Sequence, residues 1–287
     1  MDVNIKIVGL GEGGAKALGK MISAGVGKGK SVEFIAVGND ENIMLSSAAR
    51  KNIFLNRDLT TIYKSIADAL DGAKMIFIVA GLGSHAAKKA VPIIISCAKN
   101  LGAVTIALVC RPFVLENLSR KMNADYTLEQ MRGKVDTLLV MPAEKFFVFR
   151  INQPQVSLNE LFDAADDVFC QGVKIFLDML NKRDPSLALF KWGNAAFGYG
   201  EATSALDAIK LAAKFPTFEE NEIKSAQGIF VRLVSGMPLS LASIDAANKF
   251  IKEQLQPDAK FFSQDELVPT LGEKVFAAII CNRKLSD

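Results

Sequence analysis

The chain begins with a pattern that few folds accommodate: a short apolar strand, a cluster of glycines and an amphipathic helix. Residues 4–8 form the predicted strand, and the glycines follow where the strand passes into the helix, namely Gly9, Gly11, Gly13 and Gly14. Glycine lets backbone N–H groups approach a phosphate, and the positive end of a helix favours its charge. The spacing fits GxGxxG, with Asp40 at the end of the next strand as a ribose contact. The pattern predicts a nucleotide site without specifying the base; a tight turn without a ligand is the alternative.

Further apolar segments alternate with helical patterns in the first half of the chain. Strands are expected at 32–37, 74–79, 103–109 and 137–141. Because these segments are apolar throughout, both faces of their sheet must be covered, which indicates a parallel sheet between helix layers. The first half is therefore predicted to be an α/β domain.

The second half has a different order of elements. A long helical pattern ends near residue 181, and strands are then expected at 195–202 and 228–234 and near 260 and 275, with helices at 205–214 and 240–255. This order is typical of a smaller α+β domain with a mixed sheet. We predict a nucleotide-binding domain over 1–160, a central connecting helix over 161–181 and a C-terminal α+β domain over 182–287.

Composition excludes several classes of protein. Lys and Arg number 34 and Asp and Glu 31, which gives a net charge of +3, and 50% of the residues are hydrophobic. This balance is too mild for a nucleic-acid-binding tail and too apolar for a disordered chain. The apolar runs are shorter than the about 18 residues that suggest a membrane span, and the first residues lack the pattern of a signal or transit peptide. We expect a cytoplasmic chain that binds no nucleic acid and does not insert into a membrane.

The cysteines do not indicate a metal site or a disulfide framework. They are far apart, lie in apolar segments and form no CxxC pair: Cys97, Cys110, Cys170 and Cys281. Buried free thiols are the expected state, and no metal ligands are predicted.

Several longer segments carry a more specific signal. GLGEGGAKALGKMISAGV, VEFIAVGNDENIML and MIFIVAGLGSHAAKKAVPIIISCAKN are followed by RPF at 111–113, by FDAADDVFCQGVKIFLDML and by AQG at 226–228. In this order they resemble FtsZ, the bacterial and archaeal relative of tubulin, over almost the whole chain. The resemblance implies the FtsZ/tubulin fold: a parallel-sheet nucleotide-binding domain joined by a long central helix to a smaller α+β domain.

The resemblance also implies a site for GTP or GDP, with Mg²⁺ only where GTP is bound. The matching positions of the phosphate loops are Gly9, Gly11, Glu12, Gly13, Gly14, Asn39, Asp40, Gly81, Gly83 and Ser84. Glu116 and Arg120 match positions that contact ribose and phosphate. Asp166 or Asp167 matches the acid that reads guanine, because a carboxylate accepts hydrogen bonds from the N1 and N2 edge of that base. Solvated helix surface is the alternative for these two acids.

One departure concerns the glycine- and threonine-rich signature of the family, which should follow Leu82. Here it reads GSHAAKK over 83–89, so four of its five glycines are missing. Side chains with a Cβ restrict the backbone conformations that a phosphate cradle uses. Lys88 and Lys89 either replace the lost donors with charge or are solvated lysines, and His85 faces the phosphates or packs in the loop.

Two further departures concern hydrolysis. The glycine-rich loop that senses the γ-phosphate in relatives is missing between Arg57 and Ala69, and the connection from Gln171 to Trp192 is shortened. Asp184 is the candidate for a catalytic acid acting on a neighbouring subunit. Each lost charge-stabilising group costs on the order of 3 kcal/mol of barrier, and phosphoryl transfer depends on such positioning. Weakened or absent GTP binding and little or no hydrolysis are therefore predicted.

Three hypotheses for function follow. The leading one is a cytoskeletal protein that assembles head to tail into filaments, with itself or with an active FtsZ, since heterologous contacts that do not close form filaments. The second is an active GTPase in cell division with a phosphate loop rebuilt from Lys88, Lys89 or His85. The third is a nucleotide-binding regulator or a dinucleotide-dependent enzyme.

Overall fold

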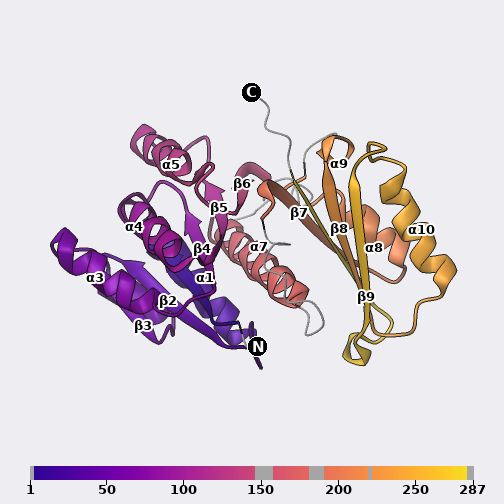
Figure 1. The fold of residues 1–287 in the computed structure, drawn as a ribbon, viewed down its shortest axis with the longest axis horizontal. Coiled ribbons are helices and arrows are strands. Elements are labelled where there is room, and N and C mark those ends of the chain that lie inside the picture. The colour runs from indigo at the N-terminus through magenta and orange to yellow at the C-terminus, as the bar shows by residue number, and fades with distance from the viewer. Residues whose placement is uncertain (1–2, 146–157, 181–190, 219–221, 283–287) are drawn as a thin grey trace. The chain divides into compact units, whose positions relative to one another are not determined.

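The computed structural model describes residues 3–145, 158–180, 191–218 and 222–282. The chain forms two compact units, Met1–Lys191 and Trp192–Asp287, and Figure 1 shows their elements in chain order. The predicted class is confirmed, because the first unit contains a parallel sheet between helices and the second a mixed sheet.

The sheet of the first unit is parallel throughout and has the order β3-β2-β1-β4-β5-β6. Its strands are β1 (Ile5–Leu10), β2 (Val32–Gly38), β3 (Lys51–Phe54), β4 (Met75–Gly81), β5 (Val104–Arg111) and β6 (Thr137–Pro142). β1 and β4 are buried along almost their whole length, as expected for central strands covered on both faces. β3 was not expected from the sequence; its four residues KNIF form an edge strand with a polar start.

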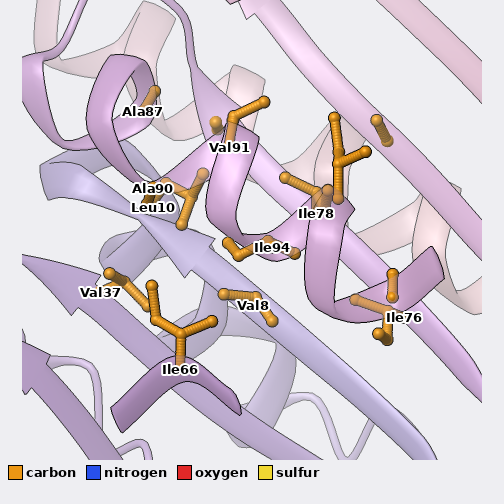
Figure 2. Packing of buried hydrophobic residues seen from close by; sticks show 14 of the residues in the cluster. Val8, Leu10, Val37, Ile66, Ile76, Ile78, Ala87, Ala90, Val91 and Ile94 are labelled. Atoms are coloured by element: carbon orange, nitrogen blue, oxygen red, sulfur yellow. The ribbon is translucent and has the colours of Figure 1, made fainter. Parts of the chain in front are cut away.

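Three helices cover one face of this sheet: α3 (Leu59–Leu70), α4 (His85–Leu101) and α5 (Leu118–Met131). Each begins with a side-chain cap, from Asp58, Ser84 and Asn117 respectively. Figure 2 shows the resulting core, in which Val8 and Ile78 of the strands pack with Val91 and Ile94 of α4.

The opposite face carries α1 (Gly11–Ser23) and α7 (Leu158–Met179), which pack on each other, while the short α2 (Glu41–Ser46) contacts α1. Phe77 of β4 meets Phe176 of α7 edge to face, with the ring centroids 6.3 Å apart. Since α1 follows β1 on one face and α4 follows β4 on the other, the connections diverge between these adjacent strands. Open α/β sheets bind ligands at such a switch point.

The second unit has the sheet order β7-β10-β8-β9, with β7 (Gly193–Ala202), β8 (Gly228–Ser235), β9 (Lys260–Leu267) and β10 (Val275–Asn282). β10 is antiparallel to β7 and β8, whereas β9 is parallel to β8. Residues of α8 (Ala205–Ala212), α9 (Glu222–Ser225) and α10 (Leu241–Lys252) share a core with the strands. A short 3₁₀ helix, Pro269–Leu271, precedes β10. No helix within the described ranges is long and apolar enough to cross a bilayer.

Candidate functional site

Two adjoining cavities lie at the carboxyl ends of β1, β4 and β5, at the switch point of the first unit. The first has a volume of about 320 Å³ and the second about 450 Å³, and Glu12, Ser84 and Arg120 border both. The smaller volume is at the lower end of the range for small-molecule pockets. Most sequence-predicted site residues line one or both cavities: Gly11, Glu12, Gly13, Asn39, Asp40, Gly81, Gly83, Ser84, Glu116, Arg120 and Asp166.

Two glycines of the first loop serve backbone packing. A Cβ on Gly9 would lie 2.5 Å from the carbonyl oxygen of Gly14, and a Cβ on Gly14 would lie 2.7 Å from the carbonyl oxygen of Val79. These contacts set α1 against β1 and β4, so the tight-turn alternative accounts for both residues. Gly13 instead borders the first cavity, and Gly11, with a φ of +67°, borders the second.

Glu12 and Lys16 form an ion pair along α1. Lys16 Nζ donates to Glu12 Oε1 at 2.8 Å, and both side chains are more than half exposed. The hydrogen bond with Glu12 raises the pKa of Lys16. Glu12 stands in the first turn, where an acidic side chain interacts favourably with the helix dipole.

The second and third loops use their polar side chains as helix caps. Asp40 Oδ1 accepts from the Ile43 N–H at 3.2 Å at the start of α2, and Asn39 lies beside it at the second cavity. Ser84 Oγ accepts from the Ala87 N–H at 3.1 Å at the start of α4. Gly83 has a φ of +101°, and a Cβ there would lie 2.9 Å from the carbonyl oxygen of Arg120.

Lys88 and Lys89 point to partners outside the loop. Lys88 Nζ donates to Asn123 Oδ1 at 3.0 Å and lies over the ring of Tyr126, and Lys89 Nζ donates to the carbonyl oxygen of Leu55 at 2.7 Å. Neither lysine borders either cavity. His85 is exposed and lines the second cavity.

The cations of the first cavity, Lys16, Arg111 and Arg120, are all paired with carboxylates. Arg120 Nε lies 2.5 Å from Glu116 Oε2, and Arg111 pairs with Asp125. Glu116 also accepts a hydrogen bond from the Phe113 N–H at 2.9 Å. The site prediction omitted Arg111 and Phe113, although both lie within the RPF tripeptide that carried part of the resemblance.

Asp166 and Asp167 are adjacent on α7, and the turn of the helix points their side chains in different directions. Asp166 is 7% exposed and borders the first cavity, whereas Asp167 is exposed and pairs with Lys20 at 2.6 Å. Burial raises the pKa of Asp166 to about 7, with the nearby Lys20 opposing the shift. Among the described residues, none donates a hydrogen bond to the Asp166 carboxyl group. The helix-surface alternative therefore fits Asp167 and not Asp166.

An apolar wall, which the sequence does not predict, surrounds Asp166. It is formed by Leu82, Phe113, Ala143, Phe162, Ala165 and Phe169. Cys110 borders the same space, and burial raises the pKa of its thiol, which keeps it protonated. The sequence signal for this wall is weak, because its members come from four separate segments of the chain.

Other predicted features concern hydrolysis and metal binding. Asp184 lies outside the described residues. Arg57 and Asp58 lead directly into α3 at Leu59, without an inserted loop. The described residues contain no cluster of three His, Cys, Asp or Glu side chains that could hold a metal ion, and the expected absence of a metal site stays a prediction.

Two family models match the chain, one in each unit. They are the Tubulin/FtsZ family, GTPase domain, over residues 56–150 and the FtsZ family, C-terminal domain, over residues 193–282. The chain belongs to the FtsZ/tubulin superfamily. The GTPase-domain match covers the segment from the start of α3 through β6, and with it much of the cavity lining.

A bacterial relative is similar to this chain over almost the whole of its length. Cell division protein FtsZ of Caulobacter vibrioides (strain NA1000 / CB15N) is 28% identical over 304 residues, covering 96% of this chain and 59% of the relative. The chain thus spans less than two thirds of that protein.

Solved structures of the superfamily share the fold. The FtsZ W319Y mutant of M. jannaschii has a TM-score of 0.84 at 24% identity, covering 98% of this chain and 91% of that one. A GTPγS-bound protofilament of CetZ2 from Haloferax volcanii has a TM-score of 0.77 at 15% identity, covering 99% and 94%.

Proposed function

We propose that the chain is an FtsZ-like structural subunit that assembles head to tail into filaments, with itself or with an active FtsZ. In this proposal it binds GTP or GDP weakly or not at all and hydrolyses little GTP. The observation that carries it is the state of the first cavity, in which Lys16, Arg111 and Arg120 are each paired with a carboxylate. An incoming phosphate would have to compete with these carboxylates for every cation on the wall.

The start of α4 supports the same conclusion. A helix that grips phosphate directs its first free N–H groups at the ligand. Here one of these groups, the Ala87 N–H, donates to Ser84 Oγ. This donor is thus already used within the chain, and the small glycines that would let a phosphate approach are replaced by residues with a Cβ.

An exposed apolar surface beside the site supports assembly. Leu115 is 94% exposed, Leu118 71% and Met122 63%, and Tyr126 continues this stripe along α5. Leu118, Met122 and Tyr126 are four residues apart and share one face of α5, and Leu115 lies in the turn just before this helix. Concentrated exposed apolar side chains mark protein–protein contacts, and the stripe begins next to Phe113 and Glu116 of the cavity wall. A second FtsZ-fold subunit is the occupant we propose for it.

Sedimentation and negative-stain microscopy test this proposal. The purified chain should form pelletable filaments at high concentration, alone or with an active FtsZ, whether or not GTP is added. Leu118→Asp should lower the pelleted fraction several-fold, because it places a charge in the proposed contact. The matched control is Leu59→Asp, which adds the same charge at an exposed leucine in the first turn of α3. A chain that stays monomeric in every mixture would contradict the proposal.

The alternative of an active GTPase has less support. Of the three groups that could rebuild the phosphate loop, Lys88 and Lys89 are bound to Asn123 and Leu55, and only His85 lines a cavity. The regulator alternative makes a different prediction, that a nucleotide co-purifies with a monomeric chain. Identifying the nucleotide in denatured, purified protein distinguishes it from the structural proposal.

A further inference from the structure

The first cavity combines an apolar wall with a buried carboxyl group. Phe113 and Phe162 meet edge to face on this wall, with ring centroids 6.2 Å apart. Aromatic side chains in a cavity stack on nucleobases, and this contact requires no charge on the ligand. The wall therefore suits the planar, uncharged part of a nucleotide.

Asp166 presents a hydrogen-bond acceptor to the cavity. It is 7% exposed, borders the cavity and accepts no hydrogen bond from any residue in the described part of the chain. A hydrogen bond to an ionised carboxylate is stronger than one between neutral groups, so a ligand with N–H donors gains affinity by pairing with it. The N1 and N2 edge of guanine presents such donors.

On the phosphate side of the site, the Glu12 carboxylate opposes the binding of a phosphate. Glu12 borders both cavities from the first turn of α1, where a bound phosphate would meet the positive end of the helix. Its carboxylate already interacts with that charge and holds Lys16 at 2.8 Å. A phosphate would either lie beside this carboxylate or take Lys16 from it, and both changes oppose binding.

We infer that the first cavity binds an uncharged purine nucleoside with an N–H donor edge, such as guanosine, in preference to its phosphorylated forms, and that Glu12 sets this preference. The inference rests on the proposed function, because it takes the cavity to be the FtsZ-type nucleotide site with weakened phosphate binding. It adds the ligand class and the residue that excludes the phosphates.

Calorimetric titration of the full chain with guanosine, GMP, GDP and GTP in the presence of Mg²⁺ tests the preference. Guanosine should bind, and the dissociation constant should rise with the number of phosphates. GDP or GTP binding as tightly as guanosine, or more tightly, would overturn the inference. Failure of guanosine to bind would overturn it as well.

Glu12→Gln tests the role of the carboxylate with little change in shape. Removal of one nearby negative charge should tighten GDP binding by about tenfold and leave guanosine binding unchanged. Glu129→Gln is the matched control, since Glu129 is an exposed residue of α5 that lines neither cavity. Equal gains for GDP and guanosine, or no gain for GDP, would contradict the assignment to Glu12.

The outcomes separate this inference from the proposed function. If none of the four ligands binds, the nucleoside preference fails, but a filament subunit with absent GTP binding stands. If the unmodified chain binds GTP tightly, both fail. If the chain binds guanosine but never forms filaments, only the proposed function fails.

Discussion

The two sides of the candidate site differ in how fully the protein satisfies its own polar groups. On the phosphate side, Glu12 holds Lys16, Ser84 caps α4 and Glu116 holds Arg120. On the opposite side, Asp166 is buried without a hydrogen-bonding partner among the described residues. The acceptor left open to a ligand therefore lies beside the apolar wall and not where phosphates would bind.

The largest expected effect comes from the Asp166 side. Because its pKa is raised from 3.8 to about 7 in the folded chain, the folded state binds more protons than the unfolded state between these values. Stability is therefore greatest below pH 4 with respect to this group and falls as the pH rises to about 7. The charged groups facing Asp166 are Lys16 and Lys20 of α1 and Asp163 and Asp167 of α7.

Asp166→Asn should remove this dependence. At pH 8 the variant should be more stable than the unmodified chain by at most about 4 kcal/mol, with a much smaller difference near pH 4. Urea denaturation at both pH values measures it. Asp167→Asn, which changes only an exposed acid, is the control. An Asp166→Asn variant that is less stable at pH 8 would show that the carboxylate is paired and the contrast between the two sides is wrong.

The glycines of the phosphate side provide the next largest effect. Gly14→Ala should destabilise the chain by about 3 kcal/mol without any nucleotide, since its Cβ would meet backbone atoms of Gly9 and Val79. Gly13→Ala is the control in the same helix turn: its Cβ would have Gly81 N at 3.9 Å as its nearest neighbour, and alanine favours the helix by up to about 1 kcal/mol. Thermal unfolding of the nucleotide-free chain compares the two. Equal destabilisation would refute the division of these glycines into packing and cavity-facing positions.

Ser84→Ala should have the smallest effect. Loss of the cap on α4 should cost about 1 kcal/mol. Because the substitution frees the Ala87 N–H, Ser84→Ala should also bind GDP somewhat more tightly than the unmodified chain. Denaturation and titration of the same variant check both expectations; weaker GDP binding would mean that Ser84 is a ligand contact and not a cap that competes with phosphate.

The fold was largely predictable from the sequence, because apolar strands and amphipathic helices carry strong periodic signals. β3 was missed because four residues with a polar start give little pattern. α5 was missed because its outward face carries Leu118, Met122 and Tyr126, which blurs the contrast between buried and exposed positions. Whether an apolar helix face is exposed depends on how the helix packs in the folded chain, and the periodicity of the sequence does not show this.

The site was predictable only in part. The loops came from the glycine pattern and the resemblance, but the sequence could not choose between Asp166 and Asp167, since adjacent helix residues point about 100° apart and the packing of α7 decides which is buried. The partners of Lys88 and Lys89 were equally hidden, because Asn123 and Leu55 are distant in sequence. Tertiary contacts, and not residue type, determined these outcomes.

Release of inorganic phosphate from GTP, measured against chain concentration with Mg²⁺ present, tests the central claim most directly. In the FtsZ-type arrangement that we propose, neighbouring subunits would complete the catalytic site, so an active enzyme shows a rate per chain that rises with concentration. We predict that the rate per chain stays at background over the whole range in which filaments pellet. A rate per chain that climbs as filaments form would contradict the account.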